Sequence, residues 1–212
     1  MKRTTNVLAI ILILFSFSNF AKADYLRVNY GVSSIDSGVN LKGSGATIDE
    51  DDSGFMLSAG KTLIGSMGVE AMYYDLGESS VKGSIGDTIT IDNATYVFET
   101  AGTVKNETSG YGLGIFAASE STNGLGTFSG MLRFGLHHWD RSGSTTLIYE
   151  SSKSFASRYY NDGVDLYLGI GLNAGLTENL ALNVSYDSMG FADDGGYGNT
   201  GSLTSVGLTL NF

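Results

Sequence analysis

The most regular pattern in the sequence is an alternation of apolar and polar positions in its C-terminal third. Between Val164 and Ala174, apolar side chains take every second position, and glycine or polar residues stand between them. Residues 180–187 and 203–212 show the same alternation. A period of two predicts β-strands with one apolar face, so we expect an all-β protein.

The same criterion, applied backward along the chain, predicts eight strands in all. They lie at residues 25–34, 54–63, 67–76, 109–118, 125–140, 162–174, 180–187 and 203–212. The connections are alternately long (35–53, 77–108, 141–161 and 190–200) and short (64–66, 121–124 and 175–178). This order predicts an eight-stranded antiparallel up-and-down transmembrane β-barrel, with four long extracellular loops, short periplasmic turns and both termini on the periplasmic side. Strand-forming residues within 77–108 predict that this connection extends as a paired ribbon.

Alternation alone does not say which face of the strands is buried. The polar positions here are mostly glycines and small polar groups with a few charges, which fill a narrow lumen better than they cover a soluble protein. We therefore expect the apolar face to meet lipid. Its clearest members are Leu166, Leu168, Ile170, Leu172, Leu182, Val184, Val206, Leu208 and Leu210.

The first residues differ from the rest of the chain. Lys2 and Arg3 precede an apolar run, and Ala21-Lys22-Ala23 follows it. This order predicts a Sec-type signal peptide at residues 1–23, cleaved after Ala23, and a barrel domain at 24–212. The apolar run is shorter than the roughly 20 residues of a transmembrane helix. We expect export to the outer membrane of a Gram-negative bacterium.

Composition narrows the function further. The chain has 30 glycines, no proline and no cysteine, so strands and turns are favoured and a disulfide framework is excluded. Its 22 acidic residues exceed its 12 basic ones, and loss of residues 1–23 leaves nine basic residues and a net charge of −13. A surface this acidic excludes nucleic acid as an expected partner.

Charged residues also occur on the face predicted to point inward. By parity, Glu70 and Arg133 share the lumen with Arg27, Asp165 and Asp187. Opposite charges held away from water stabilise one another as pairs. Two interpretations stay open: a static plug, which we favour, and an ion gate.

Several segments carry a resemblance to a known family. They are Gly68–Gly77, Leu132–Asp140, Asp162–Tyr167, Leu176–Leu182 and the terminal Phe212. With them, nearly all of residues 24–212 resembles the OmpA-like eight-stranded outer-membrane barrels. The resemblance implies a plugged lumen, an interior pair of Glu70 and Arg133, and a signal for the barrel-assembly machinery at Phe212. The family's second interior basic position falls on Gly114. Larger members carry a periplasmic peptidoglycan-binding domain after the barrel; we expect no such anchoring role here.

Two other groups could suggest chemistry. His137 and His138 are adjacent, so on a strand they point to opposite faces and cannot act together. The acidic run at 49–52 could bind a cation, but such a run is usually a solvated loop tip. Aromatic residues are expected at the membrane interface instead: Tyr30, Tyr73, Tyr111 and Tyr186 by outward parity, and Trp139 at a strand end. We expect no catalytic residues, metal site or cofactor.

The sequence therefore predicts a non-enzymatic outer-membrane barrel with a structural or surface-interaction role. Adhesion is the sharper form of that role, since surface loops commonly carry recognition. Expected partners are outer-membrane lipid and lipopolysaccharide, the barrel-assembly machinery, and an external ligand bound by the loops. Two alternatives stay open. One is a narrow porin-like channel for small solutes or ions. The other is a lipid-A-modifying enzyme, which would need a histidine beside a serine or an acid.

Overall fold

The computed structural model describes residues 24–36, 39–41, 43–91, 94–123, 126–149, 153–192 and 198–212. The predicted signal peptide lies outside these residues. Their strands are β1 (Tyr25–Ile35), β2 (Thr47–Asp49), β3 (Asp51–Ile64), β4 (Met67–Gly83), β5 (Thr88–Ile91), β6 (Ala94–Val97), β7 (Gly102–Asn123), β8 (Gly126–Tyr149), β9 (Lys153–Gly175), β10 (Leu180–Ala192) and β11 (Gly198–Asn211). Within the described part of the chain, no helix is long and apolar enough to cross a membrane.

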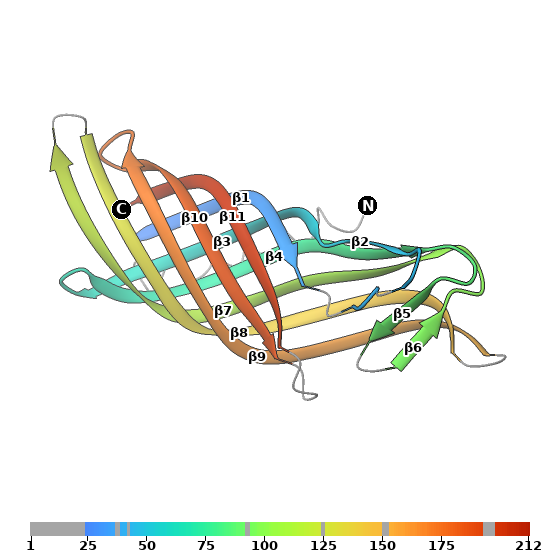
Figure 1. Ribbon diagram of the computed structural model, residues 1–212. Coiled ribbons are helices and arrows are strands. Elements are labelled where there is room, and N and C mark those ends of the chain that lie inside the picture. The colour runs from blue at the N-terminus through green and yellow to red at the C-terminus, as the bar shows by residue number, and fades with distance from the viewer. Residues whose placement is uncertain are drawn as a thin grey trace.

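Eight of these strands form a closed antiparallel ring, as the sequence predicts. The order is β1, β3, β4, β7, β8, β9, β10 and β11, and every neighbouring pair is antiparallel. β11 pairs with β1 from Tyr25↔Asn211 to Ile35↔Gly201, which closes the sheet. Figure 1 shows these strands running obliquely around one barrel. The end that holds the short turns and the described termini is called the short-turn end below, and the opposite end the long-connection end.

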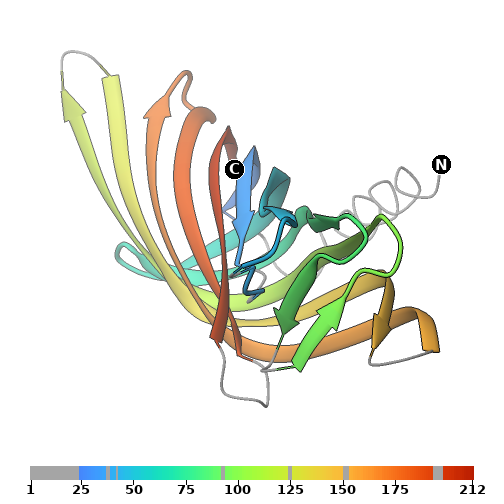
Figure 2. The same ribbon diagram turned by 45° about the vertical axis from the view of Figure 1, so that its right-hand side comes forward.

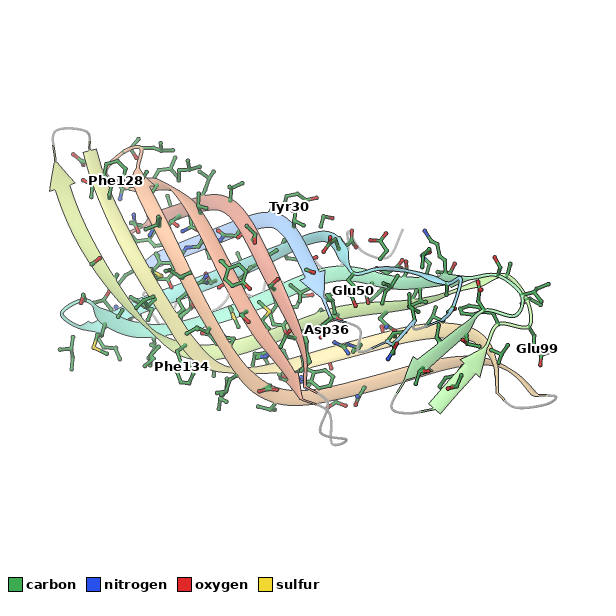
Figure 3. All side chains as sticks on the ribbon, viewed as in Figure 1. Tyr30, Asp36, Glu50, Glu99, Phe128 and Phe134 are labelled. Carbon is green, nitrogen blue, oxygen red and sulfur yellow. The ribbon has the colours of Figure 1, made fainter. Side chains whose placement is uncertain are left out.

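Side chains alternate between the two faces of the barrel wall. The nine residues predicted to face lipid are 41–66% exposed, whereas Arg27, Glu70, Arg133 and Asp187 are at most 2% exposed. Asp165 is half-buried. Figure 3 labels Tyr30 on β1 and Phe134 on β8, whose side chains project away from the barrel. The apolar residues therefore cover the outside, and the charges lie inside.

The strands at the long-connection end are much longer than predicted. β8 has 24 residues and β9 has 23, although a tilted strand crosses a membrane in about 9–11 residues. The connection at 141–161, predicted as a loop, is mostly paired strand, because β8 and β9 stay paired out to Tyr149↔Lys153. That prediction was wrong: residues 145–149 are all β-branched, aliphatic or aromatic types that favour strands.

The expected ribbon within 77–108 is confirmed, and it forms part of a larger unit. β4 and β7 pair out to Gly83↔Gly102, β5 and β6 form a hairpin, and β6 meets β8 at Val97↔Ile148. Figure 2 shows β5 and β6 lying across the extended ends of the barrel strands. We call the described residues of 39–49 and 78–108 the head.

The head has an apolar core of its own, separate from the barrel. Ile89 and Phe98 are fully buried in it, and β2 and the Asn40↔Thr90 bridge lie at its border. The core consists of Ala46, Val81, Ile89, Phe98 and Val104, with Val39, Leu41, Ile48 and Tyr96 packed against it. The head is therefore a folded element and not a set of independent loops.

Acidic side chains accept hydrogen bonds from backbone amides at the base and tip of the head. Asp87 accepts hydrogen bonds from the Ser84 amide at 2.7 Å and the Gly45 amide at 3.1 Å. Asp52 accepts one from the Glu78 amide at 2.7 Å, beside Gly77, whose φ of 77° lies at a bulge in the pairing of β4 with β7. Part of the acidic run at 49–52 therefore has a structural role.

The first described residue joins three strands at the short-turn end. The Asp24 amide donates to the Gly60 carbonyl at 2.7 Å, and the Asp24 carbonyl accepts from the Phe212 amide at 3.0 Å. Its carboxylate accepts from the Thr62 amide at 2.6 Å and from Lys61 Nζ at 3.1 Å. Asp24 thus closes the seam between β1, β3 and the end of β11.

This seam predicts a pH dependence. The Thr62 amide and then the Lys61 ammonium hold the pKa of Asp24 below its ordinary value. A carboxylate with a lowered folded-state pKa stabilises the fold above the unfolded-state pKa of about 4, and that stabilisation is lost as the pH falls through the folded-state value. We expect acidification to lower the urea midpoint of the wild type more than that of Asp24→Asn. Equal acid sensitivity of the two proteins would contradict this role.

Candidate functional site in the barrel lumen

Side chains fill the described lumen in three layers. Tyr25, Phe116 and Met131 form an apolar layer at the short-turn end. Polar and charged residues fill the middle. Toward the long-connection end lies a larger apolar and aromatic cluster: Ile35, Met56, Met72, Tyr74, Leu76, Trp139, Tyr167, Met189, Phe191 and Leu203. The charged layer is therefore covered at both ends.

An ion network occupies the middle layer. Arg133 donates to Asp187, and its Nη1 lies 3.8 Å from Glu70 Oε1; all three side chains are fully buried. Glu70 also accepts a hydrogen bond from the Tyr25 hydroxyl. The structure thus brings Glu70 and Arg133 together, as the resemblance implies, but the shorter ion pair joins Arg133 to Asp187.

The second interior arginine has different contacts. Arg27 donates through Nε to Thr209 and through Nη2 to the Met131 sulfur, both at 3.1 Å, and its guanidinium lies 4.9 Å from the centroid of the Tyr25 ring. The Asp165 carboxylate lies beside Gly190 and accepts a hydrogen bond from the Leu166 amide at 2.7 Å. Among the described residues, the fully buried charges of the middle layer are Arg27, Arg133, Glu70 and Asp187.

Amide and hydroxyl groups extend this network across the barrel. Asn29 Nδ2 donates to Asn183 and to Ser185, each at 2.8 Å. Asn183 Nδ2 donates to Asn173 at 2.8 Å, and the Ser185 hydroxyl donates to Asp187 at 3.0 Å. Polar side chains from several strands thus hydrogen-bond to one another where no bulk water reaches them.

Glycines make room for the large side chains of the lumen. A Cβ at Gly114 would lie 2.2 Å from the Tyr167 hydroxyl, and one at Gly169 would lie 2.3 Å from an Asp187 oxygen. At Gly114, where the resemblance implies a second interior base, the missing side chain instead leaves room for the Tyr167 hydroxyl. Tyr167 was not among the predicted lumen residues, although it shares the inward parity of Asp165 on β9.

The aromatic layer contains one of the two histidines. The Tyr74 hydroxyl lies 2.7 Å from His137 Nδ1, and the ring centroids of Trp139 and Phe191 are 5.8 Å apart. Arg141 lies over both rings, 5.1 Å from the Phe191 centroid. Trp139 is 2% exposed, so its predicted place at the membrane interface is wrong: odd-numbered positions of β8 face the lumen.

His138 lies on the outer face, so the predicted separation of the two histidines is confirmed. Its Nε2 is 3.4 Å from Asp162 Oδ2 and its Nδ1 is 3.9 Å from Asp140 Oδ1. Within the described residues, His138 Nδ1 has no hydrogen-bond partner, and no group of three or more potential ligands is arranged to hold a metal ion. The geometry of the described residues supplies a filled lumen.

Fold and lumen together define the structural class: a closed eight-stranded antiparallel barrel with an apolar exterior and a filled interior. No protein-family model matches the sequence, and no curated protein matches it.

Solved structures give similarity at low sequence identity. One is Ail, the attachment invasion locus protein of Yersinia pestis, in complex with the heparin analogue sucrose octasulfate (14% identity, covering 90% of this chain and 100% of that chain, TM-score 0.48). Others are Neisserial surface protein A (15%, 89% and 96%, TM-score 0.48) and the N-terminal β-barrel domain of Pseudomonas aeruginosa OprF (13%, 90% and 98%, TM-score 0.47). Similarities this distant assign no function to this chain.

The ion network predicts an asymmetry between single and double substitutions. Asp187→Ala leaves Arg133 buried without its shorter ion pair and should cost about 3–5 kcal/mol of unfolding free energy. The double variant Arg133→Met, Asp187→Leu removes both charges of the shorter pair and should recover part of that loss, because Glu70 is then buried without Arg133. Urea unfolding in detergent micelles measures both. A double variant as unstable as Asp187→Ala would refute the pairing.

Proposed function

We propose that this chain is a non-enzymatic integral protein of the bacterial outer membrane, whose apolar exterior contacts lipid and whose head serves surface interaction. The observation that carries the proposal is the orientation of the barrel wall, because apolar side chains point outward around the ring while charged and amide side chains point inward.

This orientation is the reverse of a water-soluble barrel. Besides the nine residues predicted from the sequence, further exposed apolar side chains include Val28, Val32, Val69, Leu113, Ile115, Leu132, Phe134, Leu136 and Val164. A soluble monomer rarely exposes a contiguous apolar patch larger than a few hundred Å². Lipid removes that cost, and the closed ring satisfies the backbone groups that a bilayer cannot.

The apolar belt has the height of a membrane. On β8 the outward residues are apolar or glycine from Phe128 to Leu136, and His138 and Asp140 follow. This span of nine positions, 128–136, corresponds to the roughly 9–11 residues with which a tilted strand crosses a bilayer. Tyr73, Tyr111 and His138 lie at its border toward the head, where amphipathic rings favour the interface.

The placement of the head sets the orientation that we propose. Short turns and termini of bacterial barrels face the periplasm, and long connections face outward. The short-turn end, with Asp24 and Phe212, is then periplasmic, after export by the Sec pathway and insertion by the barrel-assembly machinery. The head then stands outside, in contact with lipopolysaccharide at its base.

A role in surface interaction, adhesin-like in its specific form, rests on the head. Membrane insertion alone needs no more than short connections, yet this chain builds an apolar core from Val81, Ile89 and Phe98 beyond the belt. Binding elements commonly stand on such exposed structures, held in place by a rigid scaffold.

Insertion predicts a depth-dependent mutational cost. Leu168 lies on the apolar belt, 59% exposed, and Leu176 lies in a short turn, 57% exposed. Leu168→Arg should cost about 2–4 kcal/mol in lipid vesicles, whereas Leu176→Arg, near or beyond the interface, should cost about 0–1 kcal/mol. Reversible urea unfolding from vesicles compares the two. Equal costs would mean that Leu168 does not face acyl chains.

The surface role predicts that the head is separable from the barrel. Replacing residues 84–101 with a short turn joins Gly83 to Gly102, which already pair. The barrel should still fold, with its β-sheet dichroism kept, while binding of cells bearing the protein to host-cell or matrix surfaces is lost. Phe98→Ala, which removes about 3–5 kcal/mol of packing from the head core alone, should weaken the same binding. Undiminished binding by both variants would refute the role of the head.

If the barrel were a channel, ions would have to cross a lumen that is filled with side chains. A conducting path would have to pass the aromatic layer and the buried Arg133–Asp187 pair. We expect planar-bilayer recordings to stay silent for the wild type and for Glu70→Ala. A steady wild-type conductance that Glu70→Ala alters would overturn the closed lumen and favour the channel.

A further inference from the structure

A continuous aromatic surface crosses the outer face at the border of the apolar belt. Tyr73 on β4 is directly opposite Tyr111 on β7, which is directly opposite His138 on β8. The Tyr111 and His138 rings stack at 5.1 Å with an interplanar angle of 10°, and Phe55 lies 5.8 Å from Tyr73. We call these four residues the aromatic shelf; Tyr111 is 56% exposed.

A row of carboxylates borders this shelf on the side toward the head. Asp75 pairs in register with Ser109, Ser109 with Asp140, and Asp140 with Asp162, so all lie one outward position beyond the rings. The Asp162 side chain is 51% exposed, and that of Asp140 is 35% exposed. On the side away from the head, the outward neighbours are Leu113, Leu136 and Leu166 of the apolar belt.

We propose that the aromatic shelf and its carboxylate row bind the sugar headgroup of a membrane glycolipid. This inference rests on the proposed function, because only in a membrane does the shelf lie at headgroup level. The occupant is a lipid and not a free sugar, since the shelf continues without a break into the apolar belt, where acyl chains would contact Leu113, Leu136 and Leu166.

The chemistry of a pyranose matches both halves of this surface. One face of the ring presents C–H groups, which pack on the faces of aromatic side chains through dispersion and the ring quadrupole. Its edge carries hydroxyls, which donate strong hydrogen bonds to carboxylates. Phosphate at the same position would be repelled by Asp75, Asp140 and Asp162, so the contacting edge is a hydroxyl- or ammonium-bearing one.

The exposed tyrosine of β10 lacks these features and supplies a control. Tyr186 is 48% exposed, but its partners in register are Ile170 and Thr204, and the next outward residue on β10 is Ser188. Neither of its partners in register is therefore aromatic or acidic.

The two histidines make the test specific. In protein with 13C-labelled histidine, reconstituted in phosphatidylcholine vesicles, adding a galactosyl diacylglycerol should shift the ring signal of His138. His137, which is 1% exposed inside the lumen, should not move. Phosphatidylglycerol in place of the galactolipid should leave both signals unchanged.

Variants complete the experiment. Tyr111→Ala should weaken the galactolipid dependence of the His138 shift about fivefold, the loss of one stacked ring, while Tyr186→Ala should leave it unchanged. An unmoved His138 signal in inserted protein, equal shifts with phosphatidylglycerol, or an unaltered response of Tyr111→Ala would each overturn the glycolipid site. Failure of the protein to float with the vesicles would refute the proposed membrane function itself.

Discussion

Everything in this structure depends on the hydrogen-bonded closure of the sheet. Once β11 pairs with β1, each barrel strand has two partners along the belt, and no backbone group there needs water. Closure also fixes an inside and an outside, so each strand must keep its period of two across the belt. The apolar exterior and the polar interior are two results of the same constraint.

A ring of eight strands leaves an interior just wide enough for side chains, which must then fit one another. Here large side chains lie against glycines of neighbouring strands, as Tyr167 does against Gly114. The charges are balanced, and Arg133 is held between Asp187 and Glu70. A filled lumen leaves the outer face and the head as the surfaces on which the chain can interact with other molecules.

Much of the fold could be predicted because its signals are local. Alternation and the order of long and short connections predicted eight strands, and the structure closes them in that order. The contacts in the lumen could not be predicted in the same way. Whether Arg133 meets Glu70 or Asp187 more closely depends on the stagger between strands, which no single strand encodes. Trp139 was misplaced because an aromatic residue near a strand end suits either face, and only parity decides between them.

The head shows a second limit. Its strands were expected as a ribbon within 77–108, but its core also needs residues 39–49, which carry little strand pattern beyond Thr47–Asp49. The prediction of a loop at 141–161 was wrong for a related reason. It placed the end of each strand where the apolar alternation ends. Beyond the belt the sequence of these two strands alternates less regularly, while their pairing continues.

The central claim is that the apolar half of each barrel strand faces lipid. Nitroxide side chains placed one at a time at positions 164–174 of β9, in protein reconstituted in vesicles, test it by their collision rates with oxygen, which concentrates among acyl chains. The account predicts high oxygen accessibility at the even positions, including 168 and 170, and low accessibility at the odd ones. The opposite phase, or equal accessibility to a water-soluble relaxant along the whole segment, would contradict it.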